Sequence, residues 1–139
     1  MPKTGRTGTV RDCMAASLVT FHPDMEIDEA IKVLVQHRIS GAPVIDYHGS
    51  LIGLLSEQDC LKVMLHAAYH AESAGTVSEY MSREVKTIDV DTTIVEAAEL
   101  FLTARYRRYP VVDENRLVGQ VSRRDILHAL IQGWPLEPL

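Results

Sequence analysis

An internal repeat constrains the fold of this chain of 139 residues more than any other feature. When the sequence is shifted by 67 positions from Val10 onward, many residues meet identical residues in the second half. After one residue is lost in the second turn, an offset of 66 aligns the later matches: Gly53 with Gly119, Ser56 with Ser122 and Asp59 with Asp125. The repeat indicates two copies of one supersecondary unit. Each copy has about 60 residues and would be marginal alone, so the two are expected to pack on each other.

Hydrophobic spacing within each copy predicts the order β-α-β-β-α, an α/β (α+β) fold with a short sheet covered by two helices. In the first copy we expect strands at 19–21, 42–45 and 51–55, and helices at 24–37, which Asp24 or Asp28 would cap, and at 57–69. In the second copy we expect strands at 87–88, 109–112 and 117–121, a helix with a stripe from Ile94 to Leu102, and a helix at 124–131. Turn residues at 46–50 and 113–116 join the strand pairs.

The same pattern sets the expected domain organisation. We expect a flexible polar tail at 1–9, a first domain at 10–72, a second domain at 73–133 and a short tail at 134–139. Ala71 to Gly75 is small and polar and reads as the linker between the halves.

Composition excludes several classes of function. The formal net charge of −5 makes the chain as a whole a poor binder of nucleic acid. No apolar run approaches the roughly 20 residues that span a bilayer, and nothing at the start suggests a signal peptide. Cys13 and Cys60 lack metal-ligand spacing and read as reduced thiols of a cytoplasmic protein.

Each copy carries a Ser-x-x-Asp segment between a strand and a helix, at Ser56 to Asp59 and at Ser122 to Asp125. One interpretation is structural: the serine caps the helix, and the aspartate lies favourably at the positive end of the helix dipole. The other is functional: free N–H groups and the hydroxyl bind phosphate, while the carboxylate accepts hydrogen bonds from a ribose diol. Two copies in matching contexts favour the functional interpretation.

With these segments in place, the chain resembles tandem cystathionine-β-synthase (CBS) domains, also called a Bateman module. The resemblance rests on Val35 to Asp46 and Leu51 to Asp59 in the first copy, and on Arg105 to Asp113 and Leu117 to Asp125 in the second. It covers nearly everything from Val10 to about Leu130 and leaves no room for a catalytic domain. The resemblance implies two repeats that pack by their sheets about a pseudo-two-fold axis, with up to two adenosine-containing ligands in the cleft between them.

The resemblance also implies site residues. The aspartate of Ser-x-x-Asp would hold the ribose, the serine would hold the first phosphate, and residues of the short first strand and before the Pro-Val strand would line the adenine pocket. Carried over and joined to the nearby arginines, these are Thr20, Arg38, Ala42, Pro43, Ser56 and Asp59 in the first repeat, and Thr87, Arg107, Arg108, Tyr109, Pro110, Ser122, Arg123, Arg124 and Asp125 in the second.

Several of these residues also have a structural interpretation. Thr20 and Thr87 could be ordinary β-branched strand residues, and Arg38 and Arg105 could simply end helices, where a cation suits the dipole. Arg107, Arg108, Arg123 and Arg124 cluster near one motif of an acidic chain and favour a local anion site over solvated charge.

Other polar residues give weaker signals. His66 and His70 stand four residues apart but lack a third ligand, so we expect no metal site. His37 either contacts a ligand or ends a helix. The serines have no motif-placed base, so we expect no catalytic residue and no enzyme.

The sequence therefore predicts a regulatory module that binds AMP, ADP or ATP, with no catalytic cofactor, and that acts through ligand-dependent arrangement of its repeats. The alternatives are a ligand-free dimerisation scaffold, or a sensor of S-adenosylmethionine or NAD(H). The resemblance implies a homodimer through the repeated helices, with Trp134 as a candidate interface residue. We expect an unknown protein target, and neither membrane nor nucleic-acid binding.

Overall fold

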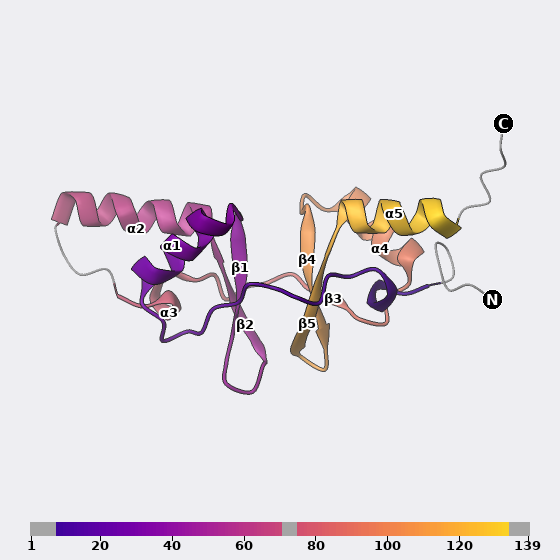
Figure 1. Ribbon diagram of the computed structural model, residues 1–139, viewed down its shortest axis with the longest axis horizontal. Coiled ribbons are helices and arrows are strands. Elements are labelled where there is room, and N and C mark those ends of the chain that lie inside the picture. Colours follow the sequence, from indigo (N-terminus) through magenta and orange to yellow (C-terminus); the bar gives the residue numbers. More distant parts are fainter. Residues whose placement is uncertain (1–7, 71–74, 134–139) are drawn as a thin grey trace. The chain divides into compact units, whose positions relative to one another are not determined.

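The structure is a computed structural model that describes residues 8–70 and 75–133 (Figure 1). The chain divides into two compact units. Val19–Val85 form one, which we term the first-repeat unit, and Met1–Leu18 with Lys86–Leu139 form the other, the second-repeat unit. Each unit thus contains most of one sequence repeat, but the opening segments are exchanged: residues 10–18 belong to the second-repeat unit and residues 77–85 to the first-repeat unit.

The first-repeat unit holds a small sheet with helices beside it. Its elements are α1 (Ile27–His37), β1 (Gly41–Ile45), β2 (Leu51–Ser56), α2 (Glu57–His70) and α3 (Val77–Tyr80). β1 and β2 are antiparallel, in a register that sets Gly41 opposite Ser56. Single bridges extend this sheet, because Phe21 pairs in parallel with Val44 and Ser82 pairs in antiparallel fashion with Leu54.

The second-repeat unit repeats this plan. Its elements are the 3-10 helix η2 (Val10–Asp12), β3 (Ile88–Asp89), α4 (Ile94–Thr103), β4 (Arg108–Asp113), β5 (Arg116–Ser122) and α5 (Arg123–Gly133). The strand order is β3-β4-β5, with β3 parallel to β4 and β4 antiparallel to β5. Ala15 bridges to Gln120 of β5, as Ser82 bridges to β2. The predicted fold class, two mixed helix–strand repeats, is confirmed.

The structure corrects the predicted first strand of each repeat. The strand expected at 19–21 is a single bridging residue, Phe21, and the strand expected at 87–88 is displaced to Ile88–Asp89. Thr20 and Thr87 therefore lie just outside the paired segments. In the first repeat, Pro23 lacks an N–H and ends the strand pairing early.

Neither predicted residue is the N-cap of the first long helix, although the Asp28 carboxylate accepts the Glu29 N–H of its first turn at 3.0 Å. α1 begins at Ile27 with Glu26 in the N-cap position, and the Glu26 side chain makes no capping bond. The Ile27 N–H donates instead to the Gly75 carbonyl oxygen at 2.9 Å, so backbone from beyond α2 satisfies it. Asp24 accepts a hydrogen bond from the Tyr47 hydroxyl at 2.6 Å.

The ends of the chain and the linker are only partly described. Gly8 and Thr9, which the sequence assigns to the tail, are packed: the Ile94 N–H donates to the Gly8 carbonyl oxygen at 3.0 Å. The remaining predicted tail residues, the linker residues 71–74 and Trp134 lie outside the described residues.

Each unit has its own hydrophobic core. Phe21, Ile27 and Leu55 are among the fully buried residues of the first-repeat unit, and Val10, Ile94 and Val121 among those of the second-repeat unit. The core side of α2 carries Cys60 and Val63, whereas the helical spacing of Leu61, Met64, Leu65 and Ala68 predicts these four as its apolar stripe. That stripe is on the outer side, with Leu61, Met64 and Leu65 exposed by 69%, 53% and 60%. An apolar helix face thus remains uncovered within this unit.

A methionine packs against a strand glycine at equivalent places in the two units. Met14 lies against Gly119 of β5, and Met81 lies against Gly53 of β2. A Cβ at position 119 would be 2.6 Å from the Met14 Sδ and 2.8 Å from the Ala15 carbonyl oxygen. Glycine is therefore required at position 119, where the segment that carries Met14 and Ala15 crosses β5.

We predict that Gly119→Ala destabilises the protein by about 1–3 kcal/mol, because overpacking here displaces backbone as well as a flexible side chain. Urea unfolding followed by circular dichroism measures the loss. Gln120→Ala is the matched control, since the neighbouring strand position already carries a Cβ and keeps its two backbone bonds to Ala15. An unchanged unfolding midpoint for Gly119→Ala would contradict this packing.

Candidate functional site

Both Ser-x-x-Asp segments lie at the junction where the last strand of a repeat becomes a helix (Figure 1). Ser56 ends β2 and Asp59 lies in the first turn of α2; Ser122 ends β5 and Asp125 lies in the first turn of α5. All four residues are half-buried. The repeat in the sequence thus corresponds to a repeated local structure.

The serine and aspartate of each junction bond to one another. The Ser56 N–H donates to the Asp59 Oδ2 at 2.9 Å, and the Asp59 N–H donates to the Ser56 Oγ at 3.2 Å. The Ser122 and Asp125 bonds correspond, at 2.8 and 3.1 Å. The structural interpretation is therefore correct as far as it goes, because each pair is a reciprocal helix cap.

Capping does not use the whole carboxylate. Within the described residues, every hydrogen bond of the Asp59 and Asp125 carboxylates goes to Oδ2, which leaves Oδ1 available to another donor. Most N–H groups at these helix starts already donate within the protein, but those of Gln58 and Arg124 have no acceptor among the described residues and favour an anion. Each junction can therefore accept hydrogen bonds from a diol while it donates to a phosphate.

A second segment is tied to each junction. The Glu57 N–H donates to the Ser40 carbonyl oxygen at 2.8 Å, and the Arg123 N–H donates to the Arg107 carbonyl oxygen at 3.1 Å. Sheet register then sets Gly41 opposite Ser56, and Arg108 opposite Ser122. The structure thus brings Arg107, Arg108, Arg123 and Arg124 to one place, as the sequence grouped them.

The arginines of the second junction are exposed and have no described ion pair. Among the described residues, the ion pairs within 4.0 Å join Arg11 to Asp91 and to Asp113.

The chain from Arg105 to Arg108 follows the end of α4 at Thr103, so Arg105 does not end a helix as expected. Arg38 does follow α1 directly, in the left-handed conformation with φ of 54°.

The residues expected to line an adenine pocket are largely core residues of their own unit. Ala42, Pro43, Tyr109 and Pro110 are buried. The Tyr109 ring packs edge-on against Phe101 at a centroid distance of 5.0 Å, and burial raises the pKa of its hydroxyl. Parallel pairing at Phe21 and Ile88 brings the preceding Thr20 and Thr87 alongside these segments.

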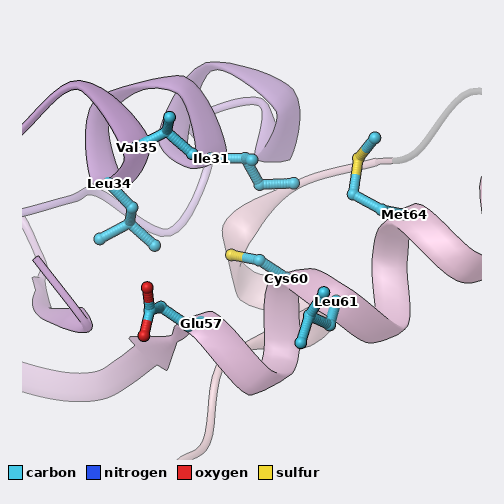
Figure 2. A pocket seen from close by; sticks show the side chains of 7 residues that line it. All are labelled: Ile31, Leu34, Val35, Glu57, Cys60, Leu61 and Met64. Carbon is cyan, nitrogen blue, oxygen red and sulfur yellow. The ribbon is translucent and has the colours of Figure 1, made fainter. Parts of the chain in front are cut away.

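The first-repeat unit contains a pocket that the sequence interpretation missed. It has a volume of about 490 Å³ and is lined by Ile31, Leu34, Val35, Glu57, Cys60, Leu61 and Met64. Figure 2 shows the α1 and α2 side chains facing one another across it. The apolar lining residues of α1 and those of α2 each recur at helical spacing in the sequence. That spacing could have indicated two helix faces that meet.

Cys60 in this pocket is a poor nucleophile. Burial, with Asp59 and Glu57 adding to it, raises the pKa of the Cys60 thiol from 9.0 to about 11. Since the thiolate is the reactive form and its fraction at pH 8 is about a hundredfold lower, we predict labelling of Cys60 by a disulfide reagent about tenfold slower than for a thiol of unshifted pKa, because a more basic thiolate is also more nucleophilic. Peptide mapping after timed labelling of folded and urea-unfolded protein measures this ratio; equal rates would contradict it.

Among the described residues, the histidines give no sign of a metal centre. In the part of the chain that the structure describes, no group of three or more His, Cys, Asp or Glu side chains could hold a metal ion. The His37 Nδ1 lies 3.0 Å from the Val33 carbonyl oxygen of its own helix. This contact fits its interpretation as a helix-end residue.

No helix among the described residues has both the length and the apolar composition that a membrane crossing requires.

Comparison with protein families gives two matches to one model. The model for the CBS domain matches residues 10–66 and again residues 77–132, which together make up most of the chain. The chain is 29% identical over 125 residues to the uncharacterized protein MJ1225 of Methanocaldococcus jannaschii. That match covers 90% of this chain but 44% of the relative, so the chain spans less than half the length of this protein.

Two solved structures share the fold. A structure of CBSX2 in complex with AMP is 30% identical with a TM-score of 0.75, and the match covers 89% of this chain and 96% of that one. The CBS domain pair of protein MJ0100, in complex with 5-methylthioadenosine and S-adenosyl-L-methionine, is 32% identical with a TM-score of 0.68. Here the match covers 90% of this chain and 96% of the other.

Proposed function

The chain belongs to the CBS-domain family, and from this membership we propose that it is a regulatory module that binds adenine nucleotides. One observation carries the proposal: two equivalent strand–helix junctions each offer an aspartate whose Oδ1 accepts no hydrogen bond from the described residues, beside a serine and a helix N-terminus. This combination suits a ribose and its 5′-phosphate. The AMP complex of CBSX2 and the adenosine-type ligands of the MJ0100 domain pair support the same ligand class.

Each side chain has a separate role in this proposal. Asp59 and Asp125 accept hydrogen bonds from the ribose hydroxyls. The Ser122 hydroxyl, the Ser56 hydroxyl once it turns from the Asp59 Oδ2, and the Gln58 and Arg124 N–H groups donate to the first phosphate. The buried Ala42 and Tyr109 segments approach the base through their backbone, because their side chains belong to the cores. Thr20 and Thr87 lie beside these segments and would contact the same base.

Regulation follows if the ligand favours one arrangement of the repeats. A ligand shifts an equilibrium only through its different affinities for the two states, and a partner protein that reads one state would respond. No step of this action needs a nucleophile or a general base, so we propose a sensor and not an enzyme. The two free thiols, Cys13 and Cys60, suit a reducing compartment such as the cytoplasm.

One observation favours a second function, that of a ligand-free scaffold. Apolar side chains are exposed on α2 and α5 at equivalent positions, which a dimerisation unit would use. We propose that the chain forms a homodimer in either case. A scaffold alone, however, would not need an arginine-rich second junction, so the sensor remains the preferred function.

Isothermal titration calorimetry tests the proposal. The protein is titrated with AMP, ATP, S-adenosylmethionine and NAD⁺, with GMP as the control that shares ribose and phosphate but not adenine. We expect saturable binding of at least one adenosine compound and weaker binding of GMP. Absence of binding for all four adenosine compounds at millimolar concentration would favour the scaffold.

A further inference from the structure

The second junction concentrates positive charge in an acidic chain. Residues 105–124 hold six arginines against Asp113 and Glu114, a formal charge of +4, whereas the whole chain carries −5. These arginines lie at the two ends of the β4–β5 hairpin. In the strand register, Arg116 lies opposite Asp113 at the turn, and Arg108 lies opposite Ser122 at the junction. Five of the six arginines therefore belong to the junction end.

These five arginines, Arg105, Arg107, Arg108, Arg123 and Arg124, are exposed. They make no ion pair within the described residues. The bond from the Arg123 N–H to the Arg107 carbonyl oxygen holds the two arginine segments together. Unpaired like charges at close range repel, so the cluster gains stability from a polyanion that neutralises it.

The first junction has the same backbone plan and the opposite charge. Ser40 and Gly41 replace Arg107 and Arg108, and Glu57 and Gln58 replace Arg123 and Arg124. A Cβ on Gly41 would meet the Leu55 carbonyl oxygen at 3.0 Å, so the position opposite Ser56 has little space for a side chain. Glu57 adds a second negative charge beside Asp59 at this junction. Arg38 and Lys62 are the cations closest in sequence to these segments.

We propose that the second junction binds a nucleotide with a polyphosphate chain, a nucleoside diphosphate or triphosphate, and that the first junction binds an adenosine compound with one phosphate or none. This inference rests on the proposed function, because it assigns ligand classes to the same two junctions. Five arginines less Asp125 give a formal charge of +4. A nucleoside triphosphate carries about four negative charges near pH 7 and offers oxygens that arginine pairs in bidentate fashion.

The two ligand classes differ in what they report. A triphosphate at one junction and a less phosphorylated adenosine compound at the other would let a single chain respond to both states of the adenylate pool. The two junctions would then be unequal sensors, although the repeats share one fold.

The test is a phosphate series of adenosine, AMP, ADP and ATP, titrated without divalent metal at two salt concentrations. Asp59→Ala protein retains the second junction, and Asp125→Ala protein retains the first. On the Asp59→Ala protein we expect affinity to rise at each added phosphate, by tenfold or more from AMP to ATP. The rise should shrink at higher salt, because exposed charges are screened over about 8 Å at physiological ionic strength. On the Asp125→Ala protein we expect no rise.

Two variants assign the effect to the junction arginines. In the Asp59→Ala background, Arg107→Gln with Arg108→Gln should reduce ATP affinity more than adenosine affinity. Arg116→Gln is the matched control, since it removes one arginine from the other end of the same hairpin, and it should leave the series unchanged.

Each outcome separates the inference from the proposed function. Equal affinity for AMP and ATP on the Asp59→Ala protein overturns the inference while adenosine binding stands, and so does a steeper rise on the Asp125→Ala protein. If inorganic triphosphate binds the second junction as tightly as ATP, the junction is a polyanion site without base recognition, and the nucleotide assignment is overturned. If neither variant binds any member of the series, the proposed function fails with the inference.

Discussion

Replacing Asp125 by alanine is expected to weaken binding of an adenine nucleotide at its junction by about ten- to a hundredfold, and Asp59→Ala should act likewise at the other junction. A hydrogen bond to a charged group contributes about 1.5–3 kcal/mol, which corresponds to this range of affinity. Titration calorimetry on each variant measures the loss. Each site should fail separately, because the two aspartates lie in different units.

The same substitutions also remove a helix cap, and this effect must be separated from binding. Loss of a cap costs about 0.5–2 kcal/mol of stability. Glu96→Ala is the matched control, because the Glu96 carboxylate caps α4 by the same geometry: it accepts from the Thr93 N–H at 3.0 Å, and its own N–H donates to the Thr93 Oγ1 at 3.1 Å. Glu96→Ala should lower the melting temperature and leave nucleotide affinity unchanged. If Asp125→Ala and Asp59→Ala behave like Glu96→Ala, the aspartates are caps and nothing more.

Introducing charge on the exposed apolar helix faces is expected to convert a homodimer to a monomer. Three pairs of equivalent positions in the two repeats expose apolar side chains: Val35 and Leu102 by 71% and 87%, Leu61 and Leu127 by 69% and 66%, and Leu65 and Ile131 by 60% and 56%. Because the exposed apolar positions are equivalent in the two repeats, their exposure is a feature of the repeat and not of one helix alone. Apolar faces of this kind mark interaction surfaces.

Leu65→Glu with Ile131→Glu places one carboxylate on each face, and burial of an unpaired charge in an interface costs several kcal/mol. Light scattering coupled to size exclusion should give twice the chain mass of 15.5 kDa for the unaltered protein and the chain mass for the double variant. Tyr47→Glu is the control, since Tyr47 is 76% exposed but lies in the β1–β2 turn, away from the helix faces. A concentration-independent monomer mass for the unaltered protein would contradict the dimer.

The architecture was predictable because the sequence repeats and because the element periods are clear. Strands and helices follow from the spacing of apolar residues. Gly53 and Gly119 match in the repeat, and these are the strand positions against which Met81 and Met14 pack. Sequence pattern did not show that the opening segment of each repeat adds to the sheet of the other repeat's unit, as Ala15 and Ser82 do. Such backbone bridges leave no periodicity of their own, and the cap of α1 was missed because a distant carbonyl satisfies it.

The candidate site was predictable at the junctions and less so around them. The Ser-x-x-Asp spacing places both side chains at a helix start, and the structure has them there. Sequence could not tell that Tyr109 points into the core, because a strand that is buried on both faces shows no alternation. It also could not assign the apolar stripe of α2 to the outer side, since Cys60 and Val63 form a second stripe with the same spacing.

Native mass spectrometry of the protein, purified from its own cell extract and then supplied with ATP and AMP, tests the central claim most directly. We predict that the protein retains a small molecule of adenosine type, or takes up AMP or ATP in a stoichiometry of up to two per chain. The protein with both Asp59→Ala and Asp125→Ala should retain much less. A protein that carries no adenosine compound from the cell, and that takes up neither AMP nor ATP when the folded state is intact, would contradict the account.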